Sequence, residues 1–412
     1  MRAKNFLCLL VVMSLLFYCQ KEKPSEPVLE NGSHPQVDIP WPSLADSPWP
    51  IAHGDVQCTG RSPLSGPQEG KVEWIFEYEG MRIEIGSPVI GEDGTIYFVD
   101  DRRLFAINPN GTLKWKYDPN RLLDTTPMIG AGDIIYFGAG RGSGSMGAIY
   151  SMNNDGTIRW HYLTDGAIHS RCGAIGLDGS IYYCDMAGFL YSITKDGALV
   201  WKSTGRSGYY GGYNSAVSMS PDGLTLYIHG LDSTINAVDI QTGEIQWYLK
   251  TGMVPNFAIL VDNDGNLYCA MRENDKQCIF SIEPTGAIRW KYFIEQSDVL
   301  DNICDMHMDY QGNIYIFTWA KRVLFSLNYY GNLRWKVEFE PDFEPPGSPI
   351  IGDKRGTVFV TSNRDYVIAY DTEGNKIFEL KIDPYALGMI SGAINRNGKL
   401  FVCSRLKLIC IK

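Results

Sequence analysis

One stretch of the chain is dense in side chains that make binding contacts. Residues 205–214 read GRSGYYGGYN, with three tyrosines, one arginine and four glycines. Tyrosine offers a rigid amphipathic contact surface, and arginine offers five hydrogen-bond donors. The pattern predicts a site that grips a peptide or a glycan. Its candidate residues are Arg206, Tyr209, Tyr210, Tyr213 and Asn214.

Charged side chains in two other stretches complete this candidate site. Residues 297–307 read SDVLDNICDMH, and residues 169–171 read HSR. Aspartates at this density also suggest calcium, but their spacing is a weak signal for it. The alternative is a solvated rim with no dedicated ligand. The candidates added here are Asp298, Asp301, Asp305, His169 and Arg171.

The sequence carries none of the compact motifs of catalytic sites. It has no HExxH, no GxSxG, no glycine-rich phosphate loop and no CxxC, and its six histidines lack ligand spacing. We therefore expect no catalytic residue, no metal and no cofactor. A net charge of −10 also denies the chain the basic face that nucleic-acid binding requires.

A repeat supplies the elements that must position these residues. The segment Gly-x-apolar-x-Trp recurs eight times, with successive glycines 41 to 46 residues apart, and its last copy ends in Phe378. A small residue lies five or six positions before each later glycine, inside an apolar run. We expect it to make room for the large aromatic ring. The tryptophans assigned to docking between units are Trp74, Trp115, Trp160, Trp201, Trp247, Trp290 and Trp335.

Each repeat unit predicts four short antiparallel strands. Asx-Gly turns such as Asp93-Gly94 favour hairpins because both residue types tolerate positive φ. Four strands in roughly 43 residues are typical of a β-propeller blade. The chain stops at Lys412, after the third strand of its last unit, whereas residues 71–76 precede the first unit. We therefore expect an all-β, eight-bladed propeller, closed by an N-terminal outer strand in the last blade.

The repeat resembles that of PQQ-like quinoprotein propellers. Residues 237–247 (AVDIQTGEIQW) match the tryptophan-docking pattern A-x-D-x-x-T-G-x-x-x-W, and residues 49–55 (WPIAHGD) look like the lead-in of bacterial PQQ-like repeat proteins. The resemblance covers residues 49–412 and implies the quinoprotein alcohol dehydrogenase-like superfamily. That superfamily contains PQQ-dependent dehydrogenases and non-enzymatic members, among them the BamB-type lipoproteins of outer-membrane assembly.

The resemblance also implies what an enzyme of this class would need. Its dehydrogenases use an adjacent Cys-Cys disulfide beneath the quinone, a stacking tryptophan, and Glu, Asn and Asp ligands for calcium. This chain has no adjacent cysteines, so we expect the non-enzymatic branch. A PQQ-dependent dehydrogenase is the alternative from a different class.

The N-terminus predicts export and a lipid anchor. A positive start precedes an apolar run of 13 residues, 6–18, which is too short to span a bilayer and suits a signal peptide. Residues 16–19 (LFYC) resemble a bacterial lipobox, although Tyr18 occupies a position that is usually small. Cys19 is therefore the expected lipidation site. The alternatives are an uncleaved anchor or cleavage further along the chain.

A proline-rich segment follows the expected anchor. Residues 20–50 contain seven prolines and no periodic apolar pattern, which predicts a flexible spacer. We divide the chain into a signal peptide (1–18), a lipid-anchored flexible tether and lead-in (19–66) and a propeller (67–412). The expected protein is a monomeric, non-catalytic scaffold of the bacterial cell envelope. It would contact the membrane only through its lipid and bind an envelope protein, peptide or glycan.

Eight cysteines follow Cys19, and none are adjacent. Two pairs, Cys269 with Cys278 and Cys403 with Cys410, are spaced to face each other across hairpins. The alternative is that these cysteines are buried free thiols.

Overall fold

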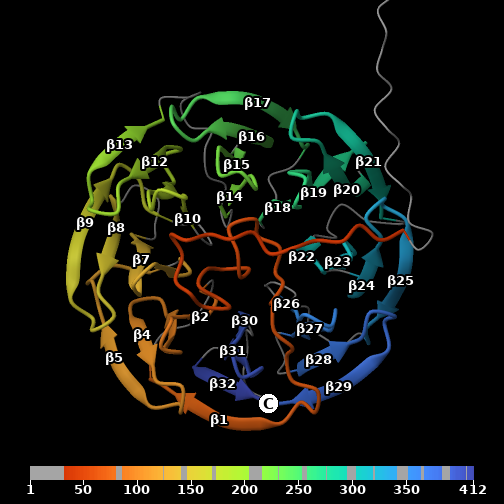
Figure 1. The fold of residues 1–412 in the computed structure, drawn as a ribbon, viewed down its shortest axis with the longest axis horizontal. Helices are drawn as coiled ribbons and strands as arrows, with labels where there is room; N and C mark the ends of the chain where they lie inside the picture. Colours follow the sequence, from red (N-terminus) through yellow and green to blue (C-terminus); the bar gives the residue numbers. More distant parts are fainter. Residues whose placement is uncertain are drawn as a thin grey trace, which may run out of the picture.

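The protein is an all-β ring. The computed structural model describes residues 32–79, 86–123, 125–140, 146–168, 173–203, 216–230, 232–252, 258–274, 276–294, 303–318, 321–340, 351–362, 366–382, 390–404 and 406–412. These residues contain no helix, and their strands form eight four-stranded antiparallel sheets. Figure 1 shows the sheets arranged as blades around a central axis. The predicted eight-bladed β-propeller is confirmed.

In the first four blades the strands follow one another in sequence from the axis outward (Figure 1). Blade 1 contains β2 (Val89–Ile90), β3 (Ile96–Val99), β4 (Leu104–Ile107) and β5 (Leu113–Tyr117); blade 2 contains β6 (Met128–Gly130), β7 (Ile134–Ala139), β8 (Gly147–Met152) and β9 (Ile158–Thr164); blade 3 contains β10 (Ala174–Ile175), β11 (Ile181–Cys184), β12 (Leu190–Ile193) and β13 (Leu199–Lys202); blade 4 contains β14 (Ser218–Met219), β15 (Thr225–Gly230), β16 (Thr234–Asp239) and β17 (Ile245–Lys250).

The last four blades repeat this order, except that blade 8 takes its outer strand from the N-terminal side. Blade 5 contains β18 (Leu260–Val261), β19 (Leu267–Glu273), β20 (Lys276–Ile282) and β21 (Ile288–Phe293); blade 6 contains β22 (Ile303–Met308), β23 (Ile314–Thr318), β24 (Val323–Leu327) and β25 (Leu333–Glu338); blade 7 contains β26 (Ile351–Gly352), β27 (Val358–Thr361), β28 (Tyr366–Tyr370) and β29 (Lys376–Lys381); blade 8 contains β30 (Ile390–Ile394), β31 (Leu400–Ser404), β32 (Lys407–Ile411) and β1 (Val72–Glu77).

Strand β1 closes the ring as predicted. It pairs antiparallel with β32, and the register places Trp74 opposite Cys410. Lys71 and Lys412 extend the pairing, since each backbone N–H donates to the carbonyl of the other at 3.0 and 2.8 Å. Both ends of the propeller are therefore held in one sheet.

The repeat residues meet at the junctions between blades. In blade 5, Trp290 lies opposite Ser281 on the neighbouring strand. The half-buried Trp290 ring packs on Gly331 of blade 6, where an added Cβ would lie 2.7 Å from the ring. Gly331 also has φ of 82°, which favours glycine. The repeat glycine therefore serves both its own turn and the junction with the preceding blade.

A hydrogen bond completes most of these junctions. The Trp290 indole N–H donates to the backbone oxygen of Tyr329 in blade 6 at 3.1 Å. Trp74 Nε1, by contrast, has no hydrogen-bond partner among the described residues. The same indole-to-carbonyl bond into the next blade joins Trp115 to Asn154, Trp160 to Lys195, Trp201 to Ile240, Trp247 to Pro284 and Trp335 to Thr372.

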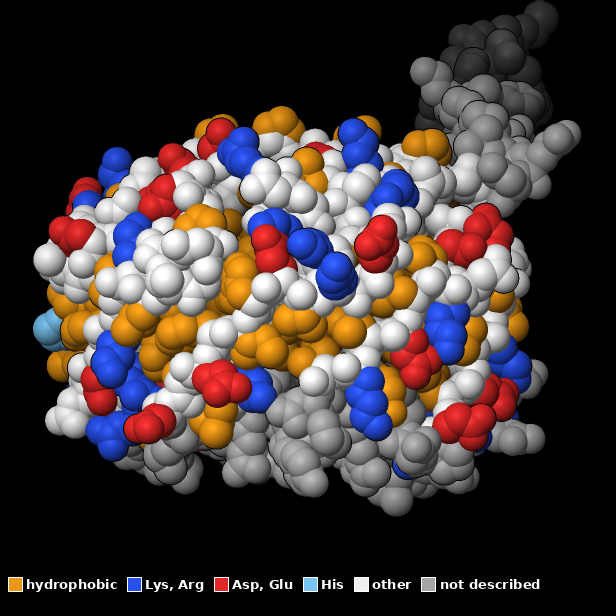
Figure 2. Space-filling model, turned by 90° about the horizontal axis from the view of Figure 1, so that it is seen from below, with side chains coloured by type: hydrophobic (Ala, Val, Ile, Leu, Met, Phe, Trp, Pro, Cys, Tyr) orange, Lys and Arg blue, Asp and Glu red, His pale blue; other side chains and the backbone are white. Residues whose placement is uncertain are grey.

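The outer strands form the side wall of the ring. The residues of the outer strands β1 and β5 are half-buried or exposed. By contrast, the second and third strands of blade 1, β3 and β4, are wholly buried. Figure 2 shows apolar side chains in a band around this wall, with charged side chains above and below it. Single exposed apolar residues are ordinary on a protein surface. The apolar residue of the repeat is exposed by about two-fifths or slightly more at Leu113, Ile158, Leu199, Ile288 and Leu333.

Candidate functional site

Most of the predicted binding mouth falls outside the described residues. This holds for Arg206, Tyr209, Tyr210, Tyr213, Asn214, His169, Arg171, Asp298 and Asp301, and also for Cys19. Asp305 is described and lies in β22 opposite Phe317, with 1% of its surface exposed. Its carboxylate accepts a hydrogen bond from the Met306 N–H at 2.8 Å. The structure therefore places Asp305 inside a blade and not on an open rim.

A second candidate region is the segment that crosses one end of the ring. We call residues 32–66 the plug; Figure 1 shows it in red and orange in front of the inner strands. We expect a flexible spacer over residues 20–50, within a tether and lead-in that ends at residue 66, but residues 32–50 are packed against the ring. These residues pack against the ring because their apolar side chains join the core of the blades and their carbonyls accept hydrogen bonds from the inner strands.

The plug supplies hydrogen-bond acceptors to the inner strands. Each inner strand is the edge of its sheet, so its backbone groups need partners from elsewhere. Plug carbonyls accept from the backbone N–H at the end of the inner strand in six blades, at 2.8 to 3.0 Å. The pairs, acceptor first, are Trp49 with Ile90, Pro50 with Ile129, Val56 with Met219, Gln57 with Val261, Thr59 with Met308, and Gly60 with Gly352.

Side chains of the plug reach the other two blades. The Trp41 indole N–H donates to the Ile175 carbonyl of blade 3 at 2.7 Å. Asp46 forms an ion pair with Arg396 of blade 8 at 2.8 Å. The plug thus contacts every blade at the end of the ring where the inner strands finish.

The plug also has a core of its own. Trp49, Ile51 and Val56 are 1–2% exposed and belong to the same clusters as residues of the blades. The sequence did not predict this role, because the seven prolines of residues 20–50 are typical of a flexible spacer. The signal that identifies it is the density of large apolar residues between Trp41 and Cys58, which a spacer does not need.

A buried arginine organises the plug near blade 6. The side chain of Arg61 is 3% exposed, and its Nη2 donates to the Val37 carbonyl at 2.7 Å. Its guanidinium lies 4.9 Å from the centre of the Tyr310 ring and 3.6 Å from Asp38. The Tyr310 hydroxyl donates to Asp38 at 2.8 Å. Burial and the Asp38 carboxylate raise the Tyr310 pKa, so the hydroxyl stays protonated.

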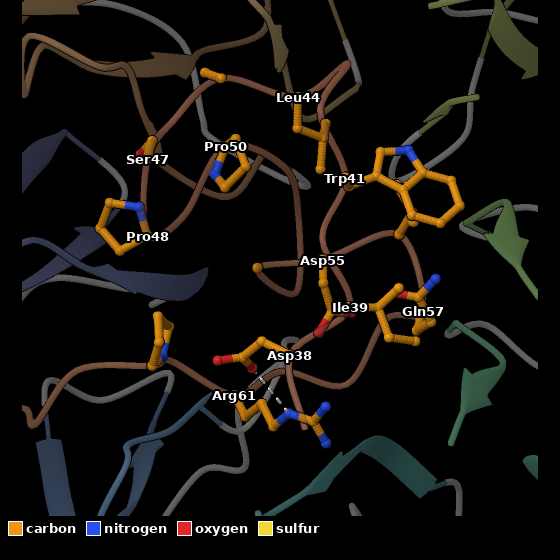
Figure 3. Close-up of a pocket in the computed structure, with 14 residues that line it drawn as sticks. Asp38, Ile39, Trp41, Leu44, Ser47, Pro48, Pro50, Asp55, Gln57 and Arg61 are labelled. Carbon is orange, nitrogen blue, oxygen red and sulfur yellow. Dashed lines mark ion pairs between the residues drawn. The ribbon is translucent and has the colours of Figure 1, made fainter. Parts of the chain in front are cut away.

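A small hollow lies within the plug beside this cluster (Figure 3). Its volume is about 180 Å³, enough for about six water molecules at roughly 30 Å³ each. Asp38 and Asp55 supply carboxylates, whereas Trp41 and several prolines supply apolar walls. Burial raises the Asp55 pKa despite the nearby Arg61 and the hydrogen bonds from Thr59. The hollow suits a few waters or a very small polar molecule, and its charged groups already bind one another.

His307 fastens the plug to β22. Its Nδ1 donates to the Thr59 carbonyl at 2.9 Å, and its ring stacks on Tyr315 with 5.5 Å between ring centres. Burial lowers the His307 pKa to about 3, so the imidazole is neutral at physiological pH. His307 is therefore a structural contact and not a general base poised near neutrality.

The described cysteines are separate buried thiols. Cys184, Cys269, Cys278, Cys403 and Cys410 are free thiols, and these five and Cys58 are all buried. The register places Cys269 opposite Phe280, and Cys410 opposite Phe401, so neither expected pair is directly cross-strand. Burial raises the pKa of the Cys269 thiol well above its usual value, which makes it a poor nucleophile.

Together the ring and its junctions define the class of this protein: it is an eight-bladed β-propeller, and its repeat resembles the PQQ-like repeat. Residues 146–314 match the family model described as outer membrane protein assembly factor BamB. This agrees with the resemblance seen in the repeat. No sequence among curated proteins matches the chain.

Solved structures extend the likeness to nearly the whole chain. Quinohemoprotein alcohol dehydrogenase ADHIIG from Pseudomonas putida HK5 is 14% identical, with a TM-score of 0.67 over 91% of this chain and 83% of that one. The corresponding enzyme from Comamonas testosteroni is also 14% identical, with a TM-score of 0.65 over 88% and 80%. BamB from Moraxella catarrhalis is 13% identical, with a TM-score of 0.59 over 82% and 100%. Identities this low establish the fold alone.

The residues of this chain do not fit PQQ in the manner the resemblance implies. The resemblance implies a disulfide between adjacent cysteines beneath the quinone, and this sequence has no adjacent pair. The six described cysteines are buried one by one among apolar side chains, so they supply no such platform. Within the described ranges, no helix is long and apolar enough to cross a membrane.

Proposed function

We propose that this chain is a lipid-anchored, non-catalytic propeller of the bacterial cell envelope that binds a protein partner. The observation that carries the proposal is the agreement of two comparisons on BamB. The family model matches residues 146–314, and the alignment with the Moraxella catarrhalis protein covers that chain completely. The lack of an adjacent cysteine pair adds support, because it removes the platform that the dehydrogenases use.

The plug fits a scaffold that is tethered at one face. Its first described residues lie beside blades 5 and 6, where the His34 N–H donates to the Gln311 carbonyl and the His34 ring stacks on Tyr329. Only 12 residues separate Cys19 from Gly32. Twelve extended residues reach about 40 Å at most. A lipid on Cys19 would therefore keep the plug within about 40 Å of the membrane surface.

The particular role favoured by the comparison with BamB is outer-membrane protein assembly. Deleting the gene tests it: we expect lower amounts of outer-membrane β-barrel proteins, restored by the intact chain. A Cys19→Ser chain should restore them poorly, although it folds normally. Unchanged outer-membrane protein levels in the deletion strain would contradict the assembly role.

The enzyme alternative has its own test. The purified protein is mixed with PQQ, calcium and a panel of alcohols and sugars, and dye reduction is followed. We expect no turnover above that of a heat-denatured sample. Sustained, substrate-dependent reduction would overturn the non-catalytic proposal.

The predicted mouth can be tested with a triple variant. Tyr209→Ala, Tyr210→Ala and Tyr213→Ala remove its aromatic surface without touching any described contact. We expect wild-type protein to recover a partner from detergent-solubilised envelope that the triple variant does not recover. Recovery of the same partner by both proteins would rule out the mouth as the binding surface.

A further inference from the structure

The residue before the docking tryptophan links neighbouring blades at two of the junctions. In blade 5 this residue is Arg289, whose Nη1 donates to the Tyr268 hydroxyl at 3.2 Å and to Ser281 Oγ at 3.0 Å. The guanidinium also lies 4.7 Å from the centre of the Tyr329 ring of blade 6. An arginine of one blade thus fills the space between its own tyrosine–serine pair and the next blade.

Blade 6 repeats this arrangement. Arg334 Nη1 donates to Ser326 Oγ at 2.9 Å and lies 3.5 Å from the Tyr315 hydroxyl. Its Nη2 donates to the Thr372 carbonyl of blade 7 at 2.9 Å. The tyrosine–serine pair of a blade is therefore a receptor for a guanidinium, used twice within the molecule.

The serine of this pair goes together with arginine around the ring. Three of the four blades with serine opposite the docking aromatic have arginine before it, whereas the four blades with Ala or Cys have none. Blade 7 replaces the whole set by Phe359, Ala369 and Ile377, so no polar pair is left there. The sequence combinations are Ser151 with Arg159, Ser281 with Arg289, and Ser326 with Arg334. In blade 2, Arg159 Nη1 donates to Asn153 Oδ1 at 3.3 Å and not to the serine.

Blade 3 keeps the receptor but lacks the arginine. Tyr182 lies opposite Ser192, in the same register as the pairs of blades 5 and 6, and both are 3% exposed or less. The residue before the docking Trp201 is Val200, which is 53% exposed. A cavity of about 390 Å³ opens there between blades 3 and 4, lined by Tyr182, Ser192 and Val200.

The lining of this cavity is suited to a cation. Asp178 and Asp222 both line it, and none of its described lining residues is a lysine or an arginine. Both carboxylates are already fixed in place, since Asp178 accepts from the Ser180 hydroxyl at 2.8 Å and Asp222 from the Ser220 hydroxyl at 2.6 Å. The cavity is therefore negatively charged and preorganised, which favours recognition of a positive group.

Apolar residues border the same cavity. Leu177 and Leu224 line it and are 46% and 53% exposed, and the half-buried Ile240 completes its wall. An arginine side chain has an apolar stem as well as a charged head, so such walls can cover its methylene groups.

We propose that the cavity between blades 3 and 4 receives an arginine side chain of a partner protein. The guanidinium would take the place that Arg289 and Arg334 fill in their own blades, donating to Tyr182 and Ser192 and facing Asp178 and Asp222. This inference rests on the proposed role as a protein-binding scaffold and names the chemistry of one contact. The expected partner segment carries an arginine flanked by apolar residues.

The direct test is calorimetric titration of the intact exported protein with two peptides. The probes are acetyl-Leu-Arg-Leu-amide and the same peptide with citrulline, which keeps the shape of arginine and removes its charge. We expect the arginine peptide to bind about tenfold more tightly, because charge-assisted hydrogen bonds are lost with citrulline. Equal binding of the two peptides, or binding of neither, would overturn the proposal.

A matched pair of variants locates the binding site. Val200→Arg should fill the cavity from within, leave the melting temperature equal or higher, and weaken binding of the arginine peptide at least about tenfold. Leu163→Arg adds the same charge at an exposed position of β9 in blade 2, outside the cavity lining, and should leave binding unchanged. Undiminished binding to Val200→Arg would place the site elsewhere and contradict the proposal.

A further variant covers the case in which Val200→Arg does not fold. Asp222→Asn keeps the size of the side chain and its hydrogen-bond acceptor while removing one charge. It should weaken binding of the arginine peptide several-fold, and unchanged affinity would overturn the proposal. The peptide titrations test only the arginine site. The proposed function is tested separately, by dye reduction with PQQ and by outer-membrane protein levels, so the two can fail independently.

Discussion

The blade junctions and the plug hold the same ring together in opposite ways. The junctions repeat one contact, in which an aromatic ring packs on a glycine of the next blade and, in most cases, donates one hydrogen bond. The plug makes a different contact with each blade, from Trp49 at blade 1 to Gly60 at blade 7. A contact made eight times leaves a period in the sequence, whereas a contact made once leaves none.

The two regions should also differ in how far a change in each destabilises the ring. A change at one junction disturbs one pair of neighbouring blades. Loss of the plug removes the partners of six inner strands at once. Four variants test this difference between the two regions, in order of decreasing expected loss of stability.

Removing residues 32–61 should have the largest effect. Six inner-strand N–H groups lose their acceptors, at about 1 kcal/mol each, and Trp49 and Ile51 lose their burial. We expect the free energy of unfolding to fall by about 5 kcal/mol or more, as measured by urea denaturation. Removing residues 20–31 instead is the control and should leave the midpoint unchanged. Equal midpoints for both deletions would show that the plug contributes nothing to the ring.

Gly331→Ala should be the most damaging single change at a junction. The new Cβ would lie 2.7 Å from the Trp290 ring, on a backbone with φ of 82°. We expect a loss of about 3 kcal/mol in thermal or chemical unfolding. Gly132→Ala is the matched control, since Gly132 has φ of 74° but open space around its Cβ position. It should cost about 1 kcal/mol, the backbone penalty alone, and equal losses would mean that the Trp290 contact adds nothing.

His307 should make the stability of the plug dependent on pH. Its pKa is lowered to about 3 in the folded protein from an ordinary value of 6.5. The unfolded chain therefore binds a proton between these values that the folded chain does not, so stability falls as pH decreases through this window. We expect this residue to contribute a slope of up to about 1.4 kcal/mol per pH unit. Urea midpoints from pH 7 to pH 4 should decline less steeply for His307→Gln, and parallel declines would exclude His307 as the source.

Trp335→Phe should have the smallest effect. It removes the indole N–H that donates to the Thr372 carbonyl at 2.8 Å while keeping an aromatic ring. We expect a loss of about 1 kcal/mol. Trp74→Phe is the control, because the Trp74 N–H has no partner among the described residues and its loss should cost almost nothing. The free energy of unfolding of both variants is measured by urea denaturation. Equal losses would show that the indole hydrogen bond does not stabilise the junction.

The ring was predictable because its signals are local and repeated. The turns before Gly94 and Gly111 and the small residue Ala106 opposite Trp115 follow from rules about hairpins and packing. Closure by β1 followed from counting strands at the two ends of the repeat. These rules need no knowledge of contacts between residues that are far apart in the sequence.

The plug and the cavity of blade 3 were not predictable in the same way. The plug pairs residues far apart in sequence, such as Thr59 with Met308, without any period. The cavity depends on Val200 standing where other blades place arginine, a difference whose meaning appears only when Arg289 is seen bound to Tyr268 and Ser281. The arginines themselves, next to three of the docking tryptophans, were visible in the sequence, but their partners were not.

Hydrogen exchange at the inner strands tests most directly whether the plug completes the ring. The backbone N–H groups to follow are those of Ile90, Ile129, Met219, Val261, Met308 and Gly352. In the intact protein they should exchange as slowly as amides paired within the blades, and in the chain lacking residues 32–61 they should exchange much faster. Rapid exchange of these amides in the intact protein would contradict the account.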